Sequence, residues 1–120
     1  MKIAITSTGP DLQSPMDPRF GRAPWILIVD TFTKAVEALD NSKNVDAFKG
    51  AGIQAGAMVS EKKAEVLLTG FCGPNAFKTL HASGIRVGVD VTGTVDEALA
   101  AFNEGRVKFS DSPNAQGHGG

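Results

Sequence analysis

The segment over residues 17–25 (Asp-Pro-Arg-Phe-Gly-Arg-Ala-Pro-Trp) combines two arginines with aromatic, proline and glycine residues immediately before an apolar run. Arginine carries a permanent charge and presents its donors in a fixed fork, which suits the binding of an anion. Loops that flank core strands commonly display binding residues. We therefore predict that Arg19, Arg22 or both capture an anion. The alternative is structural: Arg19 pairs with Asp17, and Arg22 caps a strand end.

Two glycines, Gly50 and Gly52, open a predicted helix after a polar loop. Free backbone N–H groups and the helix dipole at such a start attract an anion. The stretch is not a phosphate-binding P-loop, since no Gly-Lys-Ser/Thr follows it. It is not a dinucleotide fingerprint either, since it does not directly follow a strand. Gly50 and Gly52 are therefore candidate anion-facing residues, with close packing of the helix on a sheet as the alternative.

A further glycine-rich loop, Gly70 to Gly73, contains the only cysteine of the chain, Cys72. A thiol at a helix N-terminus can have a lowered pKa and bind a metal as thiolate. The alternative is a small residue that fills a tight turn. A single cysteine without a second ligand nearby is weak support for a metal site.

Three more residues are candidates from their position in the chain. Met16 offers a soft contact for a sulfur-rich ligand, Trp25 adds apolar surface beside the arginines, and His118 can fold over a ligand from the C-terminal segment. The sequence has no conspicuous carboxylate pair, no well-placed Ser/His/Asp set and no His/Cys spacing typical of a metal site. We therefore predict neither catalytic nor metal-ligating residues.

Length and charge limit the class of protein. The chain has 120 residues and a formal net charge of -1, which favours one domain and argues against nucleic acid as the main partner. No apolar run approaches the ~20 residues of a membrane span. The N-terminus leads directly into a strand pattern, without a signal peptide, and one cysteine cannot form an internal disulfide. We expect a cytoplasmic protein that contacts neither nucleic acid nor membrane.

The elements that must position these residues follow from the apolar pattern. Strands are predicted over 2–7, 25–30, 35–40, 65–69 and 85–89, and helices over 53–63 and from Pro74 to His81. A last helix begins at the N-cap Thr94, completes a capping box with Glu97 and stops near Gly105. A globular domain is thus expected over 1–109, followed by a flexible tail over 110–120.

Strands that alternate with helices predict parallel pairing in the second half of the chain. The expected fold is α/β: a single three-layer domain with a mixed sheet of about five strands and helices on both faces. Ligands collect at the carboxyl ends of the strands in such sheets. The loops over 8–18, 41–50 and 70–74 are expected to open on that edge.

Taken together, these motifs resemble the nitrogenase iron–molybdenum cofactor biosynthesis family, which includes the NifX group and the C-terminal domain of NifB. The resemblance rests on the opening Lys-Ile-Ala-Ile, on Asp17-x-Arg19-Phe20-Gly21-Arg22-Ala23, on the strand that ends at Asp30, on Gly50-x-Gly52-x-x-Ala55 and on Gly70. It covers roughly residues 1–107. Within the family, the chain most resembles free-standing members from sulfate-reducing bacteria that are associated with a molybdenum–copper sulfide cluster.

The resemblance implies a ribonuclease H-like topology and a protein that binds or carries a metal–sulfur cluster without catalysing a reaction. The implied cargo is an anionic molybdenum–copper sulfide cluster, or a cluster of the iron–molybdenum cofactor type. Residues Arg19 to Ala23 carry over as cluster-facing, as do Gly50 and Gly52. A protein partner in cluster delivery is also implied.

Two other functions fit the sequence less well. A protein-interaction module without cofactor can have the same composition. A metal-dependent hydrolase needs clustered acidic residues to hold its divalent metals, and the sequence supplies no such cluster.

Overall fold

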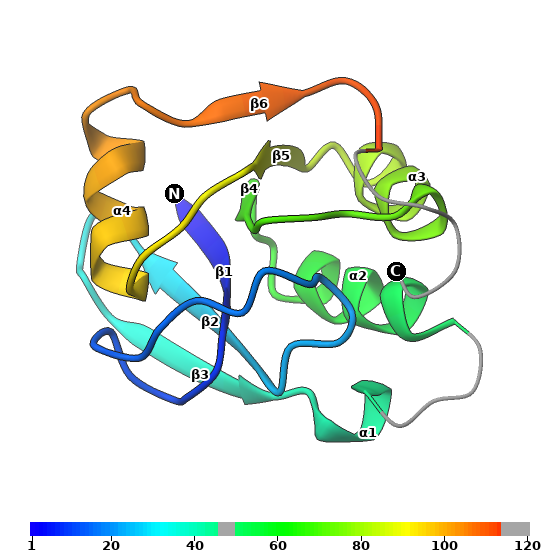
Figure 1. Ribbon diagram of the computed structural model, residues 1–120, viewed down its shortest axis with the longest axis horizontal. Helices are drawn as coiled ribbons and strands as arrows, with labels where there is room; N and C mark the ends of the chain where they lie inside the picture. The colour runs from blue at the N-terminus through cyan, green and yellow to red at the C-terminus, as the bar shows by residue number, and fades with distance from the viewer. Residues whose placement is uncertain (46–49, 114–120) are drawn as a thin grey trace.

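The computed structural model describes residues 1–45 and 50–113, and Figure 1 shows a central sheet with helices packed against it. The six strands, in the spatial order β3-β2-β1-β4-β5-β6, are β1 (Lys2–Ser7), β2 (Trp25–Asp30), β3 (Val36–Asp40), β4 (Val66–Leu68), β5 (Arg86–Val89) and β6 (Lys108–Ser110). The helices are α1 (Ser42–Val45), α2 (Ala51–Glu61), α3 (Pro74–Ala82) and α4 (Val95–Asn103).

The sheet is mixed because its strands are joined in two ways. Short connections make β1, β2 and β3 an antiparallel meander. Strand β4 is parallel to β1, and β5 is parallel to β4. Parallel neighbours need a longer crossover connection, and helices α2 and α3 supply it here. The expected mixed sheet is therefore confirmed.

Alternation along the strands divides the core between two faces. Ile3 and Ile5 of β1 belong to the cluster that packs on α4, whereas Ala4 belongs to the cluster under α2 and α3. Strands β1, β2 and β4 are buried on both faces, as is usual for the central strands of such a sheet. The predicted three-layer arrangement is confirmed: α2 and α3 lie on one face and α4 on the other (Figure 1).

Two elements differ from the sequence prediction. The sheet has six strands rather than about five, since β6 pairs antiparallel with β5 through Gly88 and Phe109. Ser110, predicted to begin the tail, is the last residue of this strand. The expected loop over 41–50 contains α1. Both elements are too short, at three and four residues, to show a period of their own.

The strand register brings distant loops to one edge of the sheet. Ser7 at the end of β1 is opposite Trp25 at the start of β2, which is opposite Asp40 at the end of β3. The carboxyl ends of β4 and β5 lie along the same edge, because both strands are parallel to β1. We call this the carboxyl edge. Within the described parts of the chain, no helix is long and apolar enough to cross a membrane.

Candidate functional site

The loop that carries the arginines is fastened to the carboxyl edge by two buried threonines. The Thr6 hydroxyl donates to the backbone carbonyl of Asp17 at 2.6 Å and lies 3.0 Å from the Thr69 hydroxyl. Thr69 Oγ1 is in turn 3.5 Å from the carbonyl oxygen of Pro18. Thr6 lies near the end of β1 and Thr69 directly follows the parallel neighbour β4, so their hydroxyls meet beneath the loop and hold it against the sheet.

Backbone hydrogen bonds join this loop to the one that follows β4. The Phe71 N–H donates to Pro18 O at 2.6 Å, and the Phe20 N–H donates to Phe71 O at 3.1 Å. Gly70 permits this approach: a Cβ there would lie 2.8 Å from Pro18 O. The two loops therefore form one short ladder, in which Arg19 is paired with Phe71.

A second glycine contact connects the arginine loop to α2. Gly21 has a φ of +95°, and a Cβ on it would lie 2.9 Å from Gly52 Cα. Glycine is needed here for both its left-handed backbone and its lack of a side chain. The predicted motifs around Arg19–Ala23, Gly50–Gly52 and Gly70–Gly73 are thus brought together. We call this assembly the rim.

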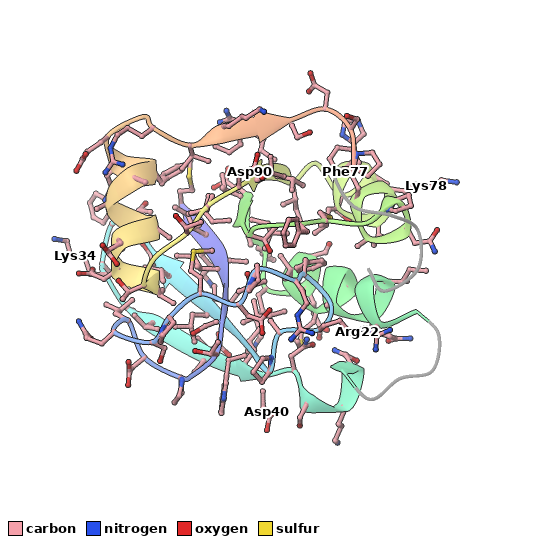
Figure 2. All side chains as sticks on the ribbon, viewed as in Figure 1. Arg22, Lys34, Asp40, Phe77, Lys78 and Asp90 are labelled. Atoms are coloured by element: carbon pink, nitrogen blue, oxygen red, sulfur yellow. The ribbon has the colours of Figure 1, made fainter. Side chains whose placement is uncertain are left out.

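The two arginines differ in their surroundings. Arg19 Nε and Nη2 lie 3.3 and 3.4 Å from the carboxylate oxygens of Asp17, which also accepts the Arg19 N–H at 2.9 Å. The pairing of Arg19 with Asp17, which was the structural alternative to anion binding, is therefore present. Nevertheless, 60% of the Arg19 side chain is exposed. Arg22 is half-buried and lies on the α2 side of the molecule, away from Lys34 (Figure 2).

Helices α2 and α3 begin at the rim without side-chain caps. Their N-cap residues are Gly50 and Gly73, and neither helix start has a capping side-chain hydrogen bond. The first-turn N–H groups of a helix have no partner within the helix itself, and here no side chain of the N-cap residue accepts from them. Such orphan donors favour an anion.

The start of α4 contrasts with these two helices. Thr94 and Glu97 form a complete capping box, and the N–H groups of Val95 and Asp96 donate to Ser14 O and Leu12 O. The donors at the start of α4 are therefore occupied within the protein.

Several candidate residues lie in the core rather than on the surface. Phe20, Ala23 and Cys72 are at most 1% exposed. Burial raises the pKa of the Cys72 thiol to about 12, the opposite of the lowered pKa that a metal-binding thiolate requires.

Met16 and Trp25 lie on the α4 face of the sheet, away from the contact between Gly21 and Gly52. Both belong to the cluster that packs on α4. Met16 is 8% exposed and Trp25 is half-buried. His118 lies outside the described residues.

The structure also identifies residues that the sequence analysis did not select. Buried Asn41 donates from Nδ2 to Ala23 O at 2.8 Å, while its N–H donates to Pro24 O, so it fixes the far end of the arginine loop. Phe71 and Ile53 expose 46% and 43% of their surface. A large apolar residue inside a glycine-rich loop was the available signal for Phe71.

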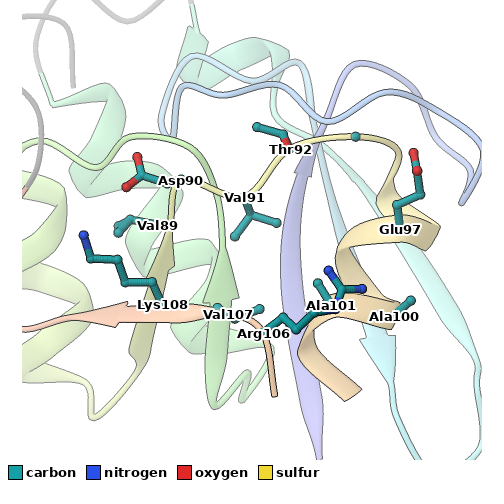
Figure 3. Close-up of a pocket in the computed structure, with 11 residues that line it drawn as sticks. Val89, Asp90, Val91, Thr92, Glu97, Ala100, Ala101, Arg106, Val107 and Lys108 are labelled. Carbon is teal, nitrogen blue, oxygen red and sulfur yellow. The ribbon is translucent and has the colours of Figure 1, made fainter. Parts of the chain in front are cut away.

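A pocket of about 420 Å³ lies away from the rim contacts, between the loop after β5, α4 and the start of β6. Figure 3 shows Asp90 and Lys108 on one of its sides and Glu97 and Arg106 on the other. Its charges are mixed, and none of the predicted site residues lines it. Among the described residues, no group of three or more His, Cys, Asp or Glu side chains is placed to hold a metal ion.

Residues 1–105 match the dinitrogenase iron–molybdenum cofactor family. The chain belongs to this family. The resemblance drawn from the sequence motifs is therefore confirmed, and it extends over most of the domain. Proteins of curated function give no match.

Three solved structures show how the family fold recurs. The apo form of the orange protein from Desulfovibrio gigas is 44% identical, covers 95% of this chain and 96% of its own, and has a TM-score of 0.92. A NifB-type protein from Thermotoga is 36% identical over 95% and 97% of the two chains, with a TM-score of 0.83. A dinitrogenase-type protein from Methanocaldococcus jannaschii, 16% identical over 94% and 97% with a TM-score of 0.69, shares the fold. The ribonuclease H-like relationship stays a prediction.

Proposed function

We propose that this member of the family binds and carries an anionic metal–sulfide cluster at the rim. The observation that carries the proposal is the convergence of exposed Arg19 with two uncapped helix starts at one edge of the sheet. Guanidinium donors and helix N-termini both favour negative charge. Family membership and the likeness to the orange protein support a cluster as the cargo.

The proposed cargo is a molybdenum–copper sulfide cluster, with a cluster of the iron–molybdenum cofactor type as the alternative. The protein holds it by charge and shape, without a cysteine ligand, since Cys72 is buried and protonated. The proposed role is transport in the cytoplasm, without catalysis, ending in transfer to a partner protein.

Reconstitution with tetrathiomolybdate and copper tests the proposal. The wild-type protein is expected to acquire visible absorbance that stays with the protein through desalting. Arg19→Ala combined with Arg22→Ala is expected to weaken uptake, while the two Arg→Lys changes retain part of it, because lysine keeps the charge and loses the planar fork.

Two controls separate binding from folding. Arg19→Ala is expected to cost about 1 kcal/mol of stability, because 60% of the Arg19 side chain is exposed and the buried Asp17 carboxylate keeps the backbone N–H of residue 19 as a partner. Arg106→Ala removes a comparable exposed arginine that pairs with Glu104, away from the rim, and is expected to leave uptake unchanged.

The proposal fails if the wild-type protein remains colourless. A colourless complex with a stable protein partner would then favour an interaction module. Magnesium-dependent hydrolysis that is lost in Asp→Asn variants would favour the hydrolase.

A further inference from the structure

Exposed apolar side chains are few in the described residues, and two of them flank the rim. The large hydrophobic residues that remain exposed are Met1, Phe32, Val36, Ile53 and Phe71. Phe71 lies in the loop after β4, and Ile53 follows Gly52 in the first turn of α2. Neither residue belongs to either of the two core clusters. Their exposed surface is therefore available to a ligand at the rim.

Phe71 stands directly beside Arg19. The two residues are partners in a parallel bridge, and side chains of directly paired residues project to the same face. Alternation explains why the next residue, Phe20, is turned inward and is 1% exposed. The rim thus presents an aromatic ring next to a guanidinium group, both open to solvent.

The backbone of Phe71, not its side chain, performs the structural role at this position. Its N–H and C=O make the two hydrogen bonds to the arginine loop, and these bonds are independent of the side chain. An aromatic residue that is 46% exposed here adds little packing to the fold. The exposed part of the ring is therefore available for contact with a ligand.

The chemistry of this pairing distinguishes two kinds of anion. An oxoanion such as molybdate is strongly hydrated, and an apolar wall that removes this water weakens its binding. A sulfide-covered metal anion is soft and polarizable, so it gains dispersion contacts with the same wall. Guanidinium is itself more weakly hydrated than ammonium, and therefore suits the second kind.

We propose that Phe71, together with Ile53, makes the rim selective for sulfide-covered metal anions over oxoanions of the same charge and shape. This inference rests on the proposed function and names the feature of the cargo that the rim recognises. The arginines attract both kinds of anion, and the apolar pair discriminates between them.

The test compares binding of tetrathiomolybdate and molybdate to the intact protein by equilibrium dialysis with metal analysis. For the double variant Phe71→Ala with Ile53→Ala, affinity for tetrathiomolybdate is expected to fall about tenfold, the order of loss for half-exposed apolar contacts. Affinity for molybdate is expected to stay unchanged. Phe32→Ala is the matched control, because Phe32 is 89% exposed in the turn between β2 and β3, at the opposite end of β2 from the rim.

The outcomes distinguish a failure of the selectivity role from a failure of the proposed carrier function. If the double variant keeps the wild-type ratio of the two affinities, or if Phe32→Ala lowers it equally, the selectivity role is wrong while the carrier function stands. If the wild-type protein binds no tetrathiomolybdate, the carrier function itself is wrong. Circular dichroism of each folded variant shows that a loss of affinity does not reflect unfolding.

Discussion

At the level of single residues, burial overrides the chemistry that position suggests. Cys72 precedes a helix start, where the dipole favours a thiolate. The side chain is nevertheless completely buried, and desolvation raises its pKa to about 12. The free energy needed to remove the thiolate from water exceeds the stabilisation that the helix dipole gives it. The residue therefore behaves as a small apolar side chain under α3.

The raised pKa of Cys72 makes stability depend on pH in the alkaline range. The thiol ionises near its ordinary value of 9.0 in the unfolded chain and near 12 in the folded one. This stabilisation is fully present below pH 9 and is lost as pH rises toward 12, by about 1.4 kcal/mol per unit. Urea unfolding from pH 8 to pH 11 measures the slope.

Comparison with Cys72→Ala isolates this contribution from the lysines that titrate in the same range. The variant is expected to show a shallower decline in stability above pH 9. Equal slopes would contradict the assigned pKa. A disulfide-exchange reagent is also expected to label the native thiol at neutral pH only as fast as the protein opens.

The ion pair between Asp17 and Arg19 is compatible with the proposed anion site. Asp17 takes the backbone N–H and two side-chain nitrogens of Arg19, so it fixes the guanidinium before any ligand arrives. The remaining donors of Arg19 are exposed. Preorganisation of this kind lowers the entropy that binding must offset.

At the level of elements, the contact between the arginine loop and α2 depends on Gly21. Gly21→Ala introduces a Cβ that meets the backbone of Gly52 at 2.9 Å in addition to an unfavourable left-handed conformation. We expect a loss of about 2–4 kcal/mol in the free energy of unfolding, measured by urea denaturation, and weaker cluster uptake.

Gly105→Ala provides the matched control for this prediction. Gly105 also has a positive φ, +72°, but nothing lies within 4 Å of a Cβ there. Only the conformational cost of about 1 kcal/mol is expected, with uptake unchanged. Equal losses for the two variants would show that the Gly21–Gly52 contact contributes nothing beyond backbone conformation.

At the level of the whole molecule, the edge strand β6 completes the α4 face. Phe109 packs edge-on against Phe102, with ring centroids 6.4 Å apart, and its ring lies 3.9 Å from the guanidinium carbon of Arg86. A chain that ends after Val107 loses these contacts and the pairing with β5. We expect it to be less stable by about 2–5 kcal/mol in thermal or urea unfolding.

A chain that ends after Pro113 keeps all of β6 and lacks His118. It is expected to unfold like the full-length protein. Its uptake of the cluster tests the predicted role of His118: normal uptake would remove His118 from the site, and a selective loss would support its contact with the cargo. A large loss of stability on removing residues 114–120 would contradict the sequence-based prediction that the domain is followed by a flexible tail.

The sequence by itself determined most of the secondary structure. The strands at 2–7 and 25–30 and the capping box at Thr94 were predicted with their observed limits, because apolar patterning along a strand and the capping of a helix are local properties of the chain. The helix predicted over 53–63 begins two residues earlier, at Ala51, since small residues carry little periodic signal. Arg19–Ala23 with the glycine motifs was also enough to indicate the family.

Only the tertiary structure decided which of these residues meet. Packing of the arginine loop on α2 brings Gly21 onto Gly52, and its bridge to the loop after β4 places Phe71 beside Arg19. Met16 and Trp25 pack with the cluster on the α4 face. These contacts join segments about 30 to 50 residues apart, and no local pattern encodes them. Burial of Cys72 and pairing of β6 have the same origin: both depend on what the rest of the chain packs against them, which spacing along the sequence does not specify.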